Sequence, residues 1–188
     1  MSIAPAQALK VAVFGKPGGG KSTLSQKIAV AADLPLVQLD LIQFRKGGAR
    51  VPDEELARLH ADILAQPRWV LDGFGTRQTF ETMLREAGVL VYVERAPLVH
   101  YWLVTKRLLK SPLAKPLGWP EGSPMLESTL SSYRYLRRSA GFWTPDFKAR
   151  LMAQRPAKRV YVIRRSSDEA VLVNDLKELA APKGKHST

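Results

Sequence analysis

Short runs of hydrophobic residues alternate along the chain with longer stretches in which hydrophobic positions recur every three or four residues. The short runs have the length of buried β-strands, and the longer stretches have the period of amphipathic helices. Five runs are predicted to be strands: Val11–Gly15, Leu36–Asp40, Trp69–Gly73, Val89–Glu94 and Arg159–Arg164. Strands that alternate with helices form βαβ units, so the pattern predicts an α/β fold around a buried parallel sheet.

Helices are predicted to fill the gaps between these strands. The segment Asp53–Ala65 follows Pro52, which suits the first turn of a helix, and places Leu56, Leu59 and Ile63 on one face. Other helices are expected at Ser22–Ala32, Thr79–Ala87, Leu98–Lys110 and about Leu126–Arg138, and a last one begins at Ser166 with a capping-box pattern. Prolines and glycines recur through Ser111–Pro124, which predicts a loop there.

Length and composition narrow the class of protein. A chain of 188 residues fits one domain, since domains cluster near roughly 100–150 residues. The mean hydropathy is −0.15, and no apolar run approaches the ~18 residues that a membrane span needs. The sequence holds no cysteine, which excludes disulfides, thiolate nucleophiles and cysteine-ligated metals. We therefore expect a single soluble domain over residues 1–188, with no membrane partner and a cytoplasmic location.

Positive charge is concentrated in one part of the chain. Residues 95–165 hold 15 basic and 3 acidic residues, which accounts for the whole net charge of +12. Such a segment attracts polyanions, whether nucleotides, nucleic acid or an anionic membrane surface. Charge alone does not choose among these partners.

The strongest motif is Gly-Lys-Pro-Gly-Gly-Gly-Lys-Ser at residues 15–22, which satisfies the G-x-x-x-x-G-K-[ST] pattern of a P-loop. A loop of glycines lets backbone N–H groups converge on phosphates, Lys21 reaches the β and γ phosphates, and Ser22 ligates Mg²⁺. The motif follows a predicted strand and precedes a predicted helix, as a P-loop requires. We expect ATP and Mg²⁺ to bind here, with contacts from Gly15, Pro17, Gly18, Gly19, Gly20, Lys21, Ser22 and Thr23.

The residues around this motif indicate which kind of P-loop protein is present. No N-K-x-D-like element follows a late strand, which disfavours a GTPase, and the fourth strand does not end in paired acids as in large ATPases. The third strand instead ends at Asp72, at the strand edge where ligands of open α/β sheets bind. Asp72 is predicted to hold a metal-bound water, and the alternative is a turn or helix cap.

Here the chain resembles the adenylate-kinase-like P-loop kinases, through residues 15–22 and the stretch Leu71-Asp72-Gly73-Phe74. It resembles more closely the related group known as DNA topology modulation proteins, which have Leu-Asp at the end of the second strand and h-D-G-N-Y-x-R after the third. Leu39-Asp40 and residues 72–77 fit that spacing, although Phe74 and Gly75 replace Asn and Tyr. The resemblance extends from about Lys10 to Leu179. It implies a three-layer P-loop NTPase fold with a five-stranded parallel sheet in the order 2-3-1-4-5.

The same resemblance locates an acceptor side. Asp40 is expected to close the second strand and to face the acceptor, where it would orient an acceptor hydroxyl or take its proton. The alternative is a strand-end cap. We expect an acceptor-side insert over about 41–68, with Phe44 and Arg45 lining it and Arg77 facing the acceptor. For these three residues an ordinary surface position is the alternative.

A basic lid is predicted over about 107–150. Kinases of this fold stabilise the moving phosphoryl group with mobile arginines that close over the nucleotide. Arg134, Arg137 and Arg138 lie at i, i+3 and i+4 and share one side of a helix, while Arg107 ends the helix before the loop. The alternative is that these arginines are merely solvated. Interleaved aromatic residues either pack the lid on the core or stack on nucleobases.

Three functions remain open at this stage. The first is a Mg²⁺-dependent small-molecule kinase that transfers the γ-phosphoryl of ATP to a nucleoside monophosphate or another small phosphate- or hydroxyl-bearing acceptor. The catalytic residues would then be Lys21, Asp40, Asp72, Arg134, Arg137 and Arg138. The second is a nucleic-acid-associated regulator that binds ATP as a switch and uses residues 95–165 on phosphates. The third is a P-loop scaffold without catalysis. No chemistry is assigned to His60 or His100.

Overall fold

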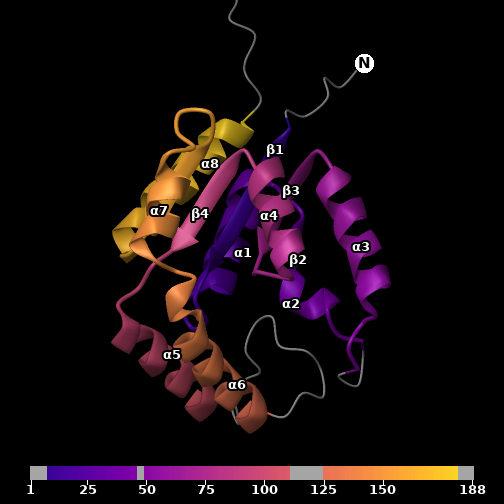
Figure 1. Ribbon diagram of the computed structural model, residues 1–188. Coiled ribbons are helices and arrows are strands. Elements are labelled where there is room, and N and C mark those ends of the chain that lie inside the picture. The colour runs from indigo at the N-terminus through magenta and orange to yellow at the C-terminus, as the bar shows by residue number, and fades with distance from the viewer. Residues whose placement is uncertain (1–7, 46–48, 111–124, 182–188) are drawn as a thin grey trace, which may run out of the picture.

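The computed structural model describes residues 8–45, 49–110 and 125–181. Its centre is a parallel sheet of five strands in the order β2-β3-β1-β4-β5 (Figure 1). The strands are β1 (Leu9–Gly15), β2 (Leu36–Gln38), β3 (Arg68–Asp72), β4 (Val89–Val93) and β5 (Arg159–Ile163). The predicted α/β class and the predicted strand order are both confirmed.

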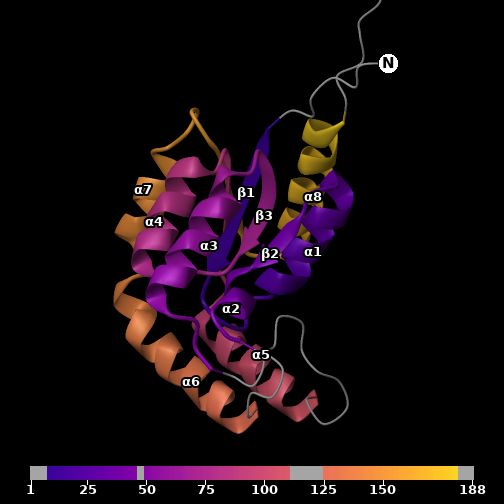
Figure 2. The same ribbon diagram turned by 90° about the vertical axis from the view of Figure 1, so that its right-hand side faces the viewer.

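Helices cover both faces of this sheet. One face carries α1 (Lys21–Ala32) and α8 (Ser166–Ala180), and the other carries α3 (Asp53–Ala65), α4 (Arg77–Glu86) and α7 (Pro145–Met152) (Figure 2). The remaining elements are α2 (Leu39–Ile42), α5 (Pro97–Lys110), α6 (Met125–Arg138) and the 3₁₀ turn η1 (Ser139–Gly141). The fold is therefore a three-layer α/β sandwich.

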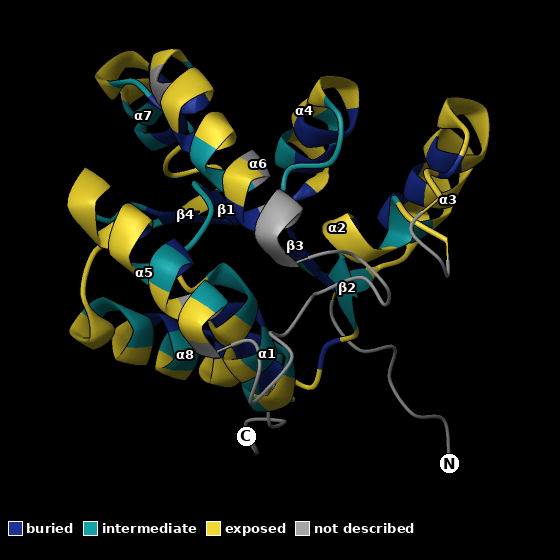
Figure 3. Ribbon diagram, turned by 90° about the horizontal axis from the view of Figure 1, so that it is seen from below, coloured by how far each residue is buried: buried dark blue, intermediate teal, exposed yellow. Residues whose placement is uncertain are grey.

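The central strand β1 contributes side chains to two separate hydrophobic cores. Successive side chains of a strand point to opposite faces. Val11 and Val13 therefore pack among the aliphatic residues of α1 and α8, while Ala12 and Phe14 pack among the aromatic residues under α4 and α7. All four are fully buried. Viewed from below, the helices ring the buried strands and expose their outer sides (Figure 3).

Aromatic rings fill the core under α4 and α7. Phe80 of α4 lies edge-on to Phe14 at 5.2 Å between ring centroids and stacks on Phe74 at 4.4 Å. Trp143 stacks on Tyr92 of β4 at 5.5 Å. Such pairs add to the free energy gained by burial. Trp143 thus packs on the core, which was one of the two interpretations of the aromatic residues near the predicted lid.

Two short helices were not predicted. The chain turns into α2 straight after Gln38, so Asp40 lies in the first turn of a helix, and the prediction that it closes the second strand is wrong. α7 begins at Pro145. Thr144 caps it by accepting a hydrogen bond from the backbone N–H of Phe147 at 3.2 Å. The predicted loop Ser111–Pro124 lies outside the described residues.

Helices α5 and α6 pack on each other beyond the carboxyl ends of the strands (Figure 1). Tyr101 of α5 stacks on Tyr133 of α6 at 5.7 Å, and the hydroxyls of Thr105 and Tyr133 are hydrogen-bonded at 2.5 Å. Within the described ranges, no helix is long and apolar enough to cross a membrane. Because α5 and α6 lie beyond the carboxyl ends of the strands, they stand at the edge of the sheet where ligands of this fold class bind.

We expect Phe80→Ala to lower the free energy of unfolding by about 3–5 kcal/mol, because Phe80 is 1% exposed and its loss leaves a cavity among five other rings. The control is Val30→Ala, since Val30 is 84% exposed and its truncation should change stability by about 0.5 kcal/mol or less. Urea unfolding followed by circular dichroism measures both. Equal losses would contradict the assignment of Phe80 to the core.

Candidate functional site

The glycine-rich loop lies between β1 and α1, at the carboxyl edge of the central strand. Gly15 has a φ of +141°, and a side chain there would collide with the carbonyl oxygen of Val93 in β4. Gly18 has a φ of +74°, and its Cβ would lie 2.8 Å from Cγ2 of Val104 in α5. Only glycine satisfies both the conformation and the space at these two positions.

Helix α1 begins directly after this loop. Gly20 precedes its first residue, no side chain caps its backbone N–H groups, and no acidic residue lies in its first turn. These donors and the positive end of the helix are therefore left for an anion. The ammonium of Lys21 donates a hydrogen bond to the backbone carbonyl of Lys16 at 3.0 Å, so it stays folded over the loop. Ser22 is half-buried and Thr23 is exposed.

Asp72 ends β3 beside this loop, because β1 and β3 are paired and Val13 is the register partner of Asp72. Its carboxyl group is buried, with 4% of the residue exposed. Oδ2 accepts a hydrogen bond of 3.4 Å from the side-chain amide of Gln38, whereas Oδ1 has no hydrogen-bond partner among the described residues. A buried carboxylate oxygen in this state is a fitting acceptor for a water or a cation.

The chemistry of these donors fits Mg²⁺. This ion prefers oxygen ligands and retains several waters, so one or two protein oxygens together with nucleotide phosphates suffice to hold it. Ser22 and Asp72 supply such oxygens from the two sides of the strand edge. In the described ranges, no cluster of three or more histidine or acidic side chains could hold a metal by itself. That result is compatible with an ion bound mainly through phosphate and water.

Asp40 lies beside the end of β3 although it belongs to a helix. A Cβ added to Gly73, the residue after Asp72, would lie 3.5 Å from Oδ1 of Asp40. Burial raises the pKa of Tyr135, and the negative charge of Asp40 contributes to that rise, which places α6 opposite α2. Asp40 itself is exposed. The strand edge thus carries one buried and one exposed carboxylate.

The three other predicted acceptor residues each have contacts of their own. Phe44 is exposed and pairs through its backbone with Arg50 in an isolated bridge. Arg45 forms an exposed ion pair with Glu55 at 2.5 Å. Arg77 forms an exposed ion pair with Glu81 at 3.2 Å, one turn along α4. Each of these two arginines therefore already has an acidic partner.

The predicted lid arginines lie on α6 and are exposed. None of Arg134, Arg137 and Arg138 forms an ion pair with another residue in the described part of the chain. The side chain of Arg107, at the end of α5, lies outside the described residues.

Two residues at the site were not predicted. Arg95 and His100 flank the β4–α5 connection, and both bond to backbone carbonyl oxygens of the glycine-rich loop. His100 is bonded to Pro17 at 2.7 Å. Arg95 also forms an ion pair of 2.7 Å with Glu169 of α8. A sequence pattern does not reveal such contacts, because the partners on the loop are backbone atoms.

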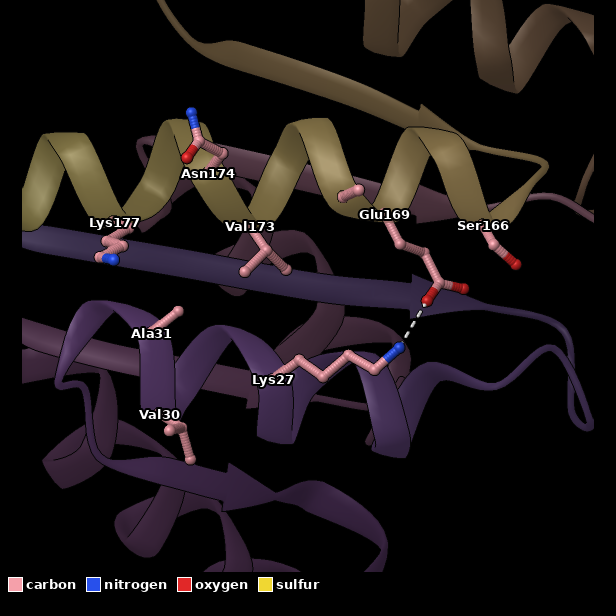
Figure 4. Close-up of a pocket in the computed structure, with 9 residues that line it drawn as sticks. Lys27, Val30, Ala31, Ser166, Glu169, Val173, Asn174 and Lys177 are labelled. Atoms are coloured by element: carbon pink, nitrogen blue, oxygen red, sulfur yellow. Dashed lines mark hydrogen bonds and ion pairs between the residues drawn. The ribbon is translucent and has the colours of Figure 1, made fainter.

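Two cavities lie away from the glycine-rich loop. The larger, of about 580 Å³, runs between α1 and α8 and is crossed at one end by the ion pair of Lys27 and Glu169 at 3.0 Å (Figure 4). Its lining includes none of the residues predicted for the nucleotide or the acceptor. The smaller, of about 210 Å³, lies between α4 and α7 and includes Arg77 and Arg150. Cavity size therefore does not locate the chemistry in this chain.

Comparison with solved structures identifies the fold. A shikimate kinase from Bacteroides thetaiotaomicron matches with a TM-score of 0.53 and 18% identity, over 91% of this chain and 97% of that chain. A shikimate kinase from Acinetobacter baumannii, solved with shikimate, matches with a TM-score of 0.48 and 19% identity, over 92% and 93% of the two chains. A gluconokinase from Sinorhizobium meliloti 1021 has a TM-score of 0.48 and 16% identity, over 92% and 91%.

Scans against protein-family models and against curated proteins find no match. Identities this low show a shared fold and nothing of the substrate. The first of the three structures supports the P-loop kinase fold that the sequence predicted. The narrower resemblance to DNA topology modulation proteins stays a prediction.

His60 lies on α3 and joins this helix to α4. Its Nδ1 is 2.6 Å from the hydroxyl of Thr79, which in turn bonds the hydroxyl of Thr76 at 2.8 Å. Burial lowers the pKa of His60. Burial also lowers the pKa of His100, and the nearby positive charges of Lys21, Lys16 and Arg95 lower it further against the opposing effect of the bond to Pro17. Both imidazoles are therefore neutral in the native protein at neutral pH.

We expect acid to destabilise the protein through these two residues. The unfolded chain takes up a proton at the ordinary histidine pKa of 6.5, whereas the folded chain resists it, so stability is present above that pH and falls below it. Urea unfolding between about pH 7.5 and pH 5.5 measures the loss. His60→Asn keeps a hydrogen-bonding group for Thr79 but does not titrate, so the stability of this variant should fall less over the same range. Parallel curves for the two proteins would contradict this account.

Proposed function

We propose that the protein is a Mg²⁺-dependent small-molecule kinase that transfers the γ-phosphoryl group of ATP to a small acceptor. The observation that carries the proposal is the placement of Lys21, Ser22 and Asp72 around one strand edge, with Asp40 beside them. The fold shared with a shikimate kinase supports it. In this proposal residues 41–68 bind the acceptor and residues 107–150 form the lid of a single domain.

Each residue has a physical role in that reaction. The amides of residues 15–20 and the ammonium of Lys21 hold the phosphates, and Ser22 and Asp72 hold Mg²⁺ directly or through water. Bound Mg²⁺ would supply neutralisation of phosphate charge. The exposed arginines of α6 (Arg134, Arg137 and Arg138) supply further positive charge to the transferred group.

The acceptor side favours an acceptor that reacts through a hydroxyl group. Asp40 and Asp72 place two carboxylates at this edge, and like charge opposes a dianionic acceptor. Arg45 and Arg77, which would offset a phosphate, each already pair with a glutamate. Asp40 can accept the proton of the acceptor's hydroxyl group. The hydroxyl oxygen then bonds to the γ-phosphorus of ATP as the bond from that phosphorus to ADP breaks. Nucleoside monophosphates remain part of the test because their phosphate is the acceptor in related folds.

The test is transfer of labelled γ-phosphate from Mg·ATP across a panel of nucleoside monophosphates and hydroxylated acids and sugars, shikimate among them. We expect one acceptor class to be labelled and Lys21→Ala to abolish the labelling, because the loop loses the ammonium group that reaches the β and γ phosphates. Lys27→Ala is the matched control on the same helix, where the side chain instead pairs with Glu169. Circular dichroism checks that both variants are folded. Labelling that survives in Lys21→Ala would refute the assigned role.

Asp40→Asn tests the acceptor chemistry separately. With a hydroxyl acceptor we expect kcat to fall by about 10²–10⁴, the usual contribution of a positioned general base, while the KM for ATP changes little. Asp33→Asn makes the same chemical change at the exposed carboxyl end of α1 and should leave kcat unchanged. An unchanged kcat in Asp40→Asn would exclude Asp40 as a base and leave it a capping or binding residue.

A second candidate function rests on the exposed arginines of α6, which are not neutralised within the described residues. They are equally suited to a nucleic-acid backbone, so ATP would then act as a switch. Lys21-dependent ATP binding without transfer to any acceptor would favour this function. Its signature is DNA or RNA affinity that falls by orders of magnitude between about 50 and 200 mM salt.

A further inference from the structure

The glycine-rich loop is held from its outer side by the connection that joins β4 to α5. Nδ1 of His100 bonds the carbonyl oxygen of Pro17 at 2.7 Å, and Nε of Arg95 donates more weakly to the carbonyl oxygen of Gly19 at 3.5 Å. These carbonyls belong to alternate peptide units of the loop. The loop therefore rests on side-chain donors as well as on van der Waals contact with Val93 and Val104.

Arg95 is itself held in place by the neighbouring strand and helix. One guanidinium nitrogen donates to the backbone carbonyl of Arg164, at the end of β5, and another pairs with Glu169 of α8 at 2.7 Å. Both side chains of this pair are largely buried, each 16% exposed. The guanidinium is thus fixed on the sheet, and the loop carbonyl approaches a donor that does not need to be ordered on binding.

The bond from His100 to Pro17 is shorter than the bond from Arg95 to Gly19, and His100 is the more buried of the two side chains. The residue is 1% exposed, and a Cβ on Gly19 would lie 3.2 Å from its Cε1. A carbonyl oxygen only accepts hydrogen bonds, so the proton on the ring must lie on Nδ1. The lowered pKa agrees with a neutral ring that carries this one proton. His100 is therefore a defined donor aimed at Pro17.

The direction of this bond determines where the next N–H group points. Pro17 and Gly18 are joined by a trans peptide, since the only cis bond among the described residues is Arg155–Pro156. In a planar trans peptide the carbonyl and the N–H group point to opposite sides. Holding the carbonyl of Pro17 toward His100 therefore turns the N–H of Gly18 away from α5, to the inner side of the loop where phosphates are bound.

We propose that His100 is a positioning residue of the phosphate-binding loop, which orients the N–H of Gly18 toward the phosphates by holding the carbonyl of Pro17. The inference rests on the proposed function, because it assigns the loop a polyphosphate ligand. His100 touches neither ATP nor the acceptor in this account. Its effect is to have the loop ordered before the ligand arrives, which reduces the entropy lost on binding.

The test compares two amides at position 100, with inorganic tripolyphosphate as the probe. The side-chain nitrogen of asparagine stands close to where Nδ1 of histidine stands, whereas glutamine carries its nitrogen farther out, near Nε2. We expect His100→Gln to weaken tripolyphosphate binding about tenfold, since one hydrogen bond is lost, and His100→Asn to stay within about threefold of the wild type. Isothermal titration calorimetry gives both dissociation constants.

Packing alone predicts the opposite order. Glutamine is nearer to histidine in volume than asparagine, so a merely space-filling residue would tolerate glutamine better. The same two substitutions at His60 are the control, because His60 is a buried histidine that bonds Thr79 and not the loop. They should change the unfolding temperature and leave tripolyphosphate affinity unchanged. If a variant is only partly folded, the rise in its unfolding temperature with added tripolyphosphate reports binding by the folded fraction.

The outcomes separate the two proposals. Equal binding by the wild type and Lys21→Ala would overturn the assignment of a phosphate site and the role of His100 with it. Lys21-dependent binding in which His100→Gln equals or exceeds His100→Asn would overturn only the role of His100. Weaker binding by His100→Gln, rescued by His100→Asn and absent from the pair at His60, is the result that supports it.

Discussion

The close packing of the glycine-rich loop on the end of β4 and the start of α5 is the constraint on which the rest of the site depends. A side chain at Gly15 would strike Val93, and one at Gly18 would strike Val104. Because the loop packs this closely on β4 and α5, α1 starts at the carboxyl edge of the central strand. No side chain caps the first backbone N–H groups of α1. Lys21 and Ser22 are thereby brought to the same edge as the carboxylate of Asp72.

Much of the fold could be predicted because its signals are local. The strands are continuous apolar runs, and the P-loop is a contiguous motif whose spacing alone identifies it. The two helices that were not predicted, α2 and α7, also have local causes. Apolar residues stand on both sides of Gln38, at Leu36, Val37 and Leu39, so the sequence does not mark the point where β2 ends and α2 begins. Helix α7 was not predicted either, although proline suits the first turn of a helix and Thr144 caps it.

The site was less predictable than the fold because its partners are distant or belong to the backbone. His100 lacks an acidic neighbour in sequence, and its partner is the carbonyl of Pro17, which every sequence would offer. Arg95 meets Glu169 across 74 residues. The ion pair of Arg77 with Glu81 is the exception, since four-residue spacing on a helix makes it readable in advance. Which arginine remains available to a ligand is therefore decided by tertiary structure.

The sheet also acts as a partition. Val13 and Phe14 are joined by one peptide bond, yet Val13 packs with the aliphatic residues of α1 and α8 while Phe14 packs with rings from α4 and the segment before α7. Effects of substitutions add when the sites share no partners. A void opened beneath α8 thus cannot be filled by enlarging a ring beneath α4. A substitution in one core can be compensated only by a second substitution in the same core, even though both cores contain side chains of the same strand.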